Sequence, residues 1–73
     1  SIGRNIDAIK SYKKAIEIKP DYAEAHNNLS VVYLQQRQYH LAIKYCDKAK
    51  ELGLINQALL EALKPYRDTA KGQ

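Results

Sequence analysis

Residues 8–18 are AIKSYKKAIEI and residues 42–52 are AIKYCDKAKEL, and the two stretches match when the chain is shifted against itself by 34 positions. In both stretches, apolar residues recur every three or four positions, which is typical of a helix that buries one face. Alanine matches alanine at Ala8 and Ala42, and again at Ala15 and Ala49. The match therefore predicts one kind of helix that occurs twice, at the spacing of an internal repeat.

Turn-forming residues mark where the first two helices end and begin. The first apolar stripe runs from about Asn5 to Lys19 and stops at Pro20, because a proline pushes the residue before it away from helical dihedral angles. A second helix is expected over about Tyr22 to Gln36. Asp21 is its candidate N-cap, and Glu24, three residues later, is the candidate capping-box partner.

Two more helices are expected in the second half of the chain. Residues 35–38 are QQRQ, without an apolar member, and predict a short turn. A new stripe covers Tyr39–Leu52, and Gly53 follows as a C-terminal cap, since glycine adopts the left-handed conformation without steric cost. Asn56 is the candidate N-cap of a last helix, in which Pro65 predicts a kink or an end.

The composition indicates an all-α protein of one small domain. The 73 residues include 3 Gly and 2 Pro, no Phe, Trp or Met, and no stretch of alternating β-branched residues. No run approaches the ~20 apolar residues that cross a bilayer, so we expect no membrane insertion. The single cysteine, Cys46, excludes an internal disulfide and is compatible with a reducing compartment. We therefore expect a cytoplasmic location.

The formal net charge of +4 raises the question of nucleic-acid binding. The basic residues are scattered along the chain and interleaved with acidic ones, which is how helical proteins commonly solvate their outer faces. We therefore do not favour a nucleic-acid partner. It stays an alternative that a steep salt dependence of binding would identify.

Sequence motifs for catalysis and metal binding are missing. His26, His40 and Cys46 do not have the spacing of metal ligands such as CxxC or HExxH. The chain contains no glycine-rich phosphate loop, no nucleophile elbow and no pair of buried carboxylates. We expect no enzyme activity, no bound metal and no cofactor, with His26 and Cys46 as core residues.

The repeat pattern resembles the tetratricopeptide repeat (TPR) family, in which pairs of helices recur every 34 residues. The first helix of that family carries a large residue, a leucine, a small residue and a tyrosine. The second helix carries an alanine, a large apolar residue and another alanine. The corresponding residues here are His26, Leu29, Ser30 and Tyr33, then Ala42, Cys46 and Ala49.

Three positions depart from the family pattern. His26 replaces the usual aromatic residue, Arg37 occupies a turn position that is often glycine, and Leu54 stands where the closing proline belongs. The small residues Ser30 and Ala42 are retained, and these are what would let two helices approach closely. We therefore expect the family fold despite the departures.

The resemblance implies an antiparallel helix-turn-helix repeat of an α-solenoid with a C-terminal capping helix. Residues 1–73 are then a single TPR-like unit at the C-terminal end of an array. Residues 3–20 would be the second helix of a partial repeat, residues 21–54 a complete repeat and residues 56–71 the capping helix. A cap with a polar outer side is what repeat arrays need at their ends.

Members of this family bind peptides or partner proteins on a concave side lined by first helices. The resemblance places six residues on that side: Glu24, Asn27, Asn28, Val31, Leu34 and Gln35. Four of them are spaced i, i+4, i+7 and i+11, so they form one ridge along the helix. The basic residues of the family's carboxylate clamp are not at these positions, which are acidic, amide or apolar.

Asn28 is the strongest candidate on this ridge. Some family members carry an asparagine ladder that hydrogen-bonds the backbone of a bound peptide, and Asn28 falls at that position. A side-chain amide both donates and accepts, so it can pair with a main chain of any sequence. The alternative is that Asn28 is only solvated or braces a neighbouring helix.

The first helix would lack a partner helix within its own repeat. We expect its apolar side to be exposed, and exposed apolar stripes generally acquire a partner. The residues concerned are Ile6, Ile9, Tyr12 and Ile16. Self-association of the isolated chain through this side, as a structural or oligomerisation segment, is the alternative to peptide or partner binding.

Overall fold

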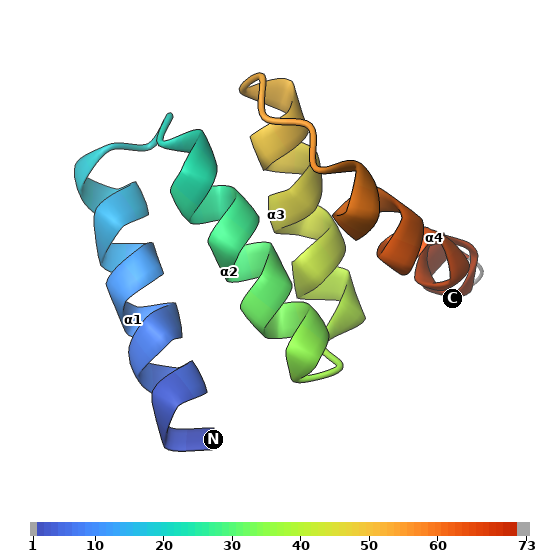
Figure 1. Ribbon diagram of the computed structural model, residues 1–73, viewed down its shortest axis with the longest axis horizontal. Coiled ribbons are helices and arrows are strands. Elements are labelled where there is room, and N and C mark those ends of the chain that lie inside the picture. Colours follow the sequence, from blue (N-terminus) through green and yellow to red (C-terminus); the bar gives the residue numbers. More distant parts are fainter. Residues whose placement is uncertain (1, 72–73) are drawn as a thin grey trace.

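The computed structural model describes residues 2–71, with side-chain surroundings for residues 3–67, and therefore leaves Ser1 and residues 72–73 outside the description (Figure 1). The described residues form four helices, α1 (Ile2–Ile18), α2 (Ala23–Gln35), α3 (Tyr39–Glu51) and α4 (Gln57–Lys71). Successive helices run antiparallel, with α2 between α1 and α3 and with α4 beside α3 (Figure 1). The expected all-α repeat architecture is confirmed.

Both predicted N-termini in the first half were misplaced. Helix α1 begins at Ile2, ahead of Asn5, because the apolar pattern marks only the packed part of a helix. The N-cap of α2 is Tyr22, and no side chain caps this helix. The Tyr22 amide donates to the Lys19 carbonyl at 3.0 Å, which closes a backbone turn around Pro20 just ahead of the helix. Asp21 therefore lies inside that turn, one residue too early for a capping box.

The two turns flanking α3 both use left-handed backbone. Arg37 has φ +61°, an uncommon value for a residue with a side chain, at the position where the family often has glycine. Gly53 has φ +102°. The Leu54 amide donates to the Ala49 carbonyl at 2.8 Å and the Gly53 amide donates to the Lys50 carbonyl at 2.9 Å, which is the hydrogen-bond pattern of a Schellman cap. The predicted cap at Gly53 is confirmed.

Helix α4 is capped as predicted and continues past its proline. The Leu59 amide donates to Asn56 Oδ1 at 3.1 Å, so Asn56 is the N-cap. Pro65 lies inside the helix, and the ribbon changes direction in the second half of α4 without ending (Figure 1). Of the two outcomes predicted for Pro65, the structure has the kink. Tyr66 and Arg67 contact α3 just after it and hold the second half in place.

The core forms where α2 crosses α3, the most extensive helix contact in the described residues. Leu29 and Leu63 are both 0% exposed, so α4 contributes a leucine to the same core as Leu29. Ser30 and Ala42 are equally buried, and the Ser30 hydroxyl donates to the Ala42 carbonyl at 2.6 Å. Small residues at these points allow the two backbones to approach, as expected from the sequence.

The expected exposed stripe on α1 is largely wrong. Ile9, Tyr12 and Ile16 are half-buried and pack against the core cluster of α2, α3 and α4. Ile6, which is 46% exposed, is the only one of the four predicted residues that stays exposed. The stripe is covered because α1 uses it to pack on α2, the first helix of the following repeat.

Replacing Gly53 with alanine should lower the free energy of unfolding by about 1 kcal/mol, since an alanine at positive φ is strained. An added Cβ meets no atom within 4 Å, so the loss reports the backbone conformation alone. Gly3→Ala is the matched control, because Gly3 lies in α1 and is equally open. It should raise stability by up to about 1 kcal/mol. Urea titrations followed by circular dichroism measure both, and equal effects of the two variants would contradict the prediction.

Leu63→Ala should lower the free energy of unfolding by about 3 kcal/mol, because it leaves a cavity between α3 and α4. Ile55→Ala is the control, since Ile55 is 62% exposed and its truncation removes little buried area. Thermal unfolding of both variants measures the difference. A loss below about 1 kcal/mol for Leu63→Ala would show that α4 is not part of the cooperative core.

Candidate functional site

Helix α2 is covered on most sides, and one strip stays open. Its buried face, which includes Leu29 and Tyr33, packs against α1 and α3. The open strip contains Glu24, Asn28 and Gln35, all exposed. The structure thus keeps three of the six predicted binding residues together on one accessible ridge.

The other three predicted residues are half-buried and lie off the open strip. Val31 and Leu34 are half-buried against the core cluster. Asn27 is also half-buried, and its Oδ1 accepts a hydrogen bond from Asn56 Nδ2 at 3.1 Å. Asn56 is 29 positions away in sequence, so no local pattern could have identified this contact. Asn27 therefore braces the N-terminus of α4.

Asn28 makes no such contact. Among the side chains described for residues 3–67, its amide has no hydrogen-bond partner, and it is exposed near the middle of α2. Both the donor and the acceptor of this amide are available to a ligand. Of the two asparagines on this helix, Asn27 is structural and Asn28 is open.

A row of aromatic rings lies between α2 and α3, on a different face of α2 from the ridge of Glu24, Asn28 and Gln35. Tyr45 stacks on His26 with ring centroids 5.9 Å apart and on Tyr33 at 5.8 Å. His26 is 5% exposed, and its Nε2 donates to the Pro20 carbonyl at 2.8 Å. The proton on Nε2 leaves Nδ1 of a neutral ring as a buried acceptor without a partner. His26 is therefore a core residue, as expected, with one polar atom unsatisfied.

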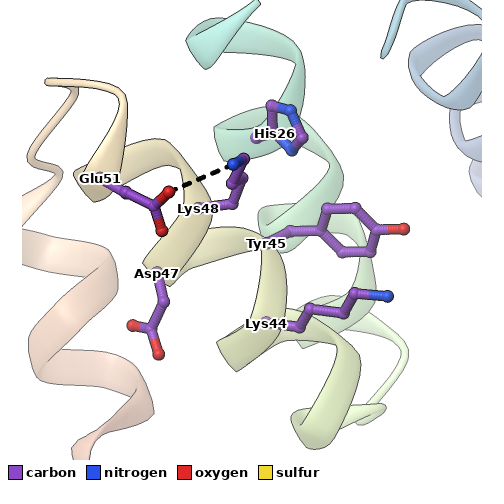
Figure 2. A pocket seen from close by; sticks show the side chains of 6 residues that line it. All are labelled: His26, Lys44, Tyr45, Asp47, Lys48 and Glu51. Carbon is purple, nitrogen blue, oxygen red and sulfur yellow. Dashed lines mark hydrogen bonds and ion pairs between the residues drawn. The ribbon is translucent and has the colours of Figure 1, made fainter. Parts of the chain in front are cut away.

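Two hollows open beside this aromatic row. One hollow has a volume of about 290 Å³, and its lining includes His26, Lys44 and Tyr45. Lys44 and Tyr45 extend from α3 to one side of the helix, whereas Asp47 points to the other side (Figure 2). A hollow of about 530 Å³ lies between α1 and the start of α3. The stacked rings of Tyr33 and Tyr45 connect the two.

We call this surface the lysine groove. Its α1 wall is Ile6, Ile9, Lys10 and Lys13, and its floor is His26 and Tyr33 of α2. Its α3 wall consists of Leu41, Lys44, Tyr45, Asp47, Lys48 and Glu51. Tyr33 follows Asn28 by five residues, about 140° around the helix, so the groove and the ridge lie on different faces of α2. The sequence analysis did not identify this groove. The i, i+3 and i+7 spacing of Leu41, Lys44 and Lys48 was its one local signal.

Polar contacts on the far side of α3 hold α4 in place. Arg67 Nη1 and Nη2 donate to the two carboxylate oxygens of Asp47 at 3.1 and 2.6 Å. The hydrogen bond to Asp47 raises the pKa of Arg67. Tyr39 and Tyr66 stack with centroids 3.6 Å apart, and their hydrogen bond raises the pKa of Tyr39.

The described residues contain few groups suited to chemistry. Burial raises the pKa of the Cys46 thiol, which disfavours the reactive thiolate. Among the side chains that the structure describes, in residues 3–67, no three histidine, cysteine or carboxylate groups lie together so that they could hold a metal ion. In the same part of the chain, no helix has the length and apolar character to cross a membrane.

Comparisons with known proteins agree with this architecture. A family model described as TPR repeat matches residues 1–36, and one described as Tetratricopeptide repeat matches residues 23–53. The chain is similar to stress-induced-phosphoprotein 1 of Caenorhabditis elegans, with 36% identity over 47 residues. That match covers 64% of this chain and 15% of the relative, so the chain spans a small part of that protein's length. No solved structure matches the chain.

The two models overlap on α2 and together span residues 1–53. Across that span, antiparallel helices meet through the small and apolar residues that the repeat pattern requires. TPR repeats are in general protein–protein interaction modules and not catalytic domains. This chain belongs to the tetratricopeptide repeat family.

Proposed function

We propose that the ridge of Glu24, Asn28 and Gln35 binds an extended peptide of a partner protein. The observation that carries this proposal is the exposure of these three polar side chains on a helix whose other sides are covered. A covered helix is held rigidly, and rigid positioning lowers the entropic cost of binding. The ridge is therefore a preorganised surface.

Asn28 is the central residue of this binding mode. Its amide can donate to a peptide carbonyl and accept from a peptide N–H at once. Glu24 and Gln35 extend the ridge by one turn before Asn28 and about two turns after it. Val31 and Leu34 contribute half-exposed apolar area beside it. Such a surface recognises the main chain first and leaves sequence preference to the flanking apolar contacts.

The position of the chain in an array follows from the same assignment. Residues 3–20 supply the second helix of a partial repeat, residues 21–54 a complete repeat and residues 56–71 a cap. Helix α4 supports the role of a cap, because it buries Leu59 and Leu63 and leaves Lys64 exposed. A longer array would extend the ridge with the first helices of neighbouring repeats.

The effect of Asn28→Ala on peptide affinity tests the ridge. Peptides selected on this chain from a random display library should shift the amide NMR signals of Glu24, Asn28 and Gln35. Asn28→Ala should weaken their binding by about three- to tenfold, the effect of one hydrogen bond with a net value of about 1 kcal/mol. Isothermal titration calorimetry measures the affinity, and circular dichroism verifies the helix content.

The control is Asn5→Ala, which makes the same chemical change on α1, away from the ridge. It should leave peptide affinity within about twofold of the original. Selected peptides that bind Asn28→Ala and Gln35→Ala as tightly as the unchanged chain would eliminate the ridge as the binding site.

Self-association through Ile6, Ile9, Tyr12 and Ile16 is the second candidate. One observation favours it, namely that Ile6 is exposed at the edge of α1. The other three residues already pack against the core, so Ile6 would have to anchor the contact. If this candidate holds, sedimentation equilibrium at micromolar concentration gives a dimer and Ile6→Ser gives a monomer. A monomer for the unchanged chain rejects it.

A further inference from the structure

We propose that the lysine groove is a second binding surface, which takes an acidic, amphipathic segment of a partner protein. The groove lies on a different face of α2 from the Asn28 ridge, and its residues come mainly from the second helices α1 and α3. It is independent of peptide binding on the ridge. Three properties of the groove carry the proposal, namely its charge, its apolar lining and its length.

The unpaired charge of the groove is positive on both walls. Two carboxylates also line its α3 side, but Asp47 is paired with Arg67 and Glu51 with Lys48. Lys10 and Lys13 project from α1, and among the described side chains of residues 3–67 no carboxylate pairs with either of them. Lys44 lies over the Tyr45 ring at 5.3 Å and is likewise without an acidic partner there. Lys48 alone is paired, with Glu51 at 3.2 Å. Three ammonium groups around one hollow surface therefore attract a ligand with several negative charges.

The lining between these lysines is apolar. Ile6 is exposed, and Ile9, Leu41 and Tyr45 are half-buried around the same hollows. A ligand with carboxylates alone would leave this area in contact with water. A segment with acidic residues on its edges and apolar residues on one face would satisfy both the lysines and the lining.

The groove has the length of a short helix. Its α3 wall runs from Leu41 to Glu51, about 15 Å along the helix axis, which equals about three turns of a bound helix. Tyr33 lines one hollow and Tyr45 lines the other, and their rings are stacked, so the two hollows are neighbours. In Figure 2, Tyr45 and Lys44 point to the side of the picture on which α1 lies, so the two walls face a shared space.

The aromatic row argues against a nucleic acid in this groove. Single-stranded nucleic acids stack their bases on exposed aromatic rings. Here Tyr33 is buried, and Tyr45 is already stacked between Tyr33 and His26. A second copy of this chain is also disfavoured, because two copies of a groove with the same unpaired lysines repel each other.

A labelled helical peptide of about 12 residues, with glutamates along its edges and leucines on one face, is the probe. Fluorescence anisotropy measures its binding to the full chain. Lys10→Glu with Lys13→Glu should weaken binding by about tenfold, since each reversal replaces an attraction with a repulsion. Ile6→Ser should also weaken it, by about threefold, because that change removes apolar contact without changing the charge.

The charge-matched control is Lys50→Glu with Lys64→Glu, because these exposed residues line neither hollow. It should change affinity by less than about threefold. A control effect as large as that of the groove variant would reduce the interaction to general electrostatics and overturn the proposal. An unchanged affinity for Ile6→Ser would overturn it as well.

Three further measurements distinguish the groove from a surface without charge recognition, from a nucleic-acid surface and from the ridge. A peptide with lysine in place of glutamate should not bind, and equal binding would reject charge recognition. Oligothymidine should not displace the acidic peptide, and displacement at equal concentration would identify a nucleic-acid surface instead. Asn28→Ala should leave acidic-peptide binding unchanged, whereas a loss would place the peptide on the ridge. That last variant also distinguishes failure of this proposal from failure of the proposed ridge function.

Discussion

The close approach of α2 and α3 at Ser30 and Ala42 is the contact on which the rest of the structure depends. Both residues are fully buried, and the Ser30 hydroxyl reaches the Ala42 carbonyl across the helix interface. A larger side chain at either point would separate the helices and empty the space that Leu29 and Leu63 now fill. The hydrogen bond also satisfies a hydroxyl that would otherwise be buried without a partner.

This approach determines what each face of α2 can do. With α3 on one side and α1 on the next, α2 has a single open strip, the ridge of Glu24, Asn28 and Gln35. On a different face, α1 and α3 stand as two walls above Tyr33, and the lysine groove lies between them. The ridge belongs to α2 alone, whereas the groove needs α1 and α3 on either side of α2.

The sequence predicted most of the fold, and three of the six residues that it placed on the binding side lie on the exposed ridge. Caps that depend on one residue, at Gly53 and Asn56, were predictable because their chemistry is local. The cap at Tyr22 was not, since a backbone turn around Pro20 displaced the expected side-chain cap. The sequence analysis placed both Asn27 and Asn28 among the binding residues. No pattern in the sequence could show that Asn27 would instead accept a hydrogen bond from Asn56.

The sequence by itself determined the family, the helices and the buried positions of α2 and α3, because these follow from residue periodicity and from side-chain size at each repeat position. The tertiary structure decided which residues remain accessible. Ile9, Tyr12 and Ile16 are covered because α1 packs on α2, and Lys10, Lys13 and Lys44 share a groove because two helices, 34 positions apart in the repeat, stand on either side of a third. Accessibility depends on which helices are neighbours in space, and periodicity within one helix carries no information about that.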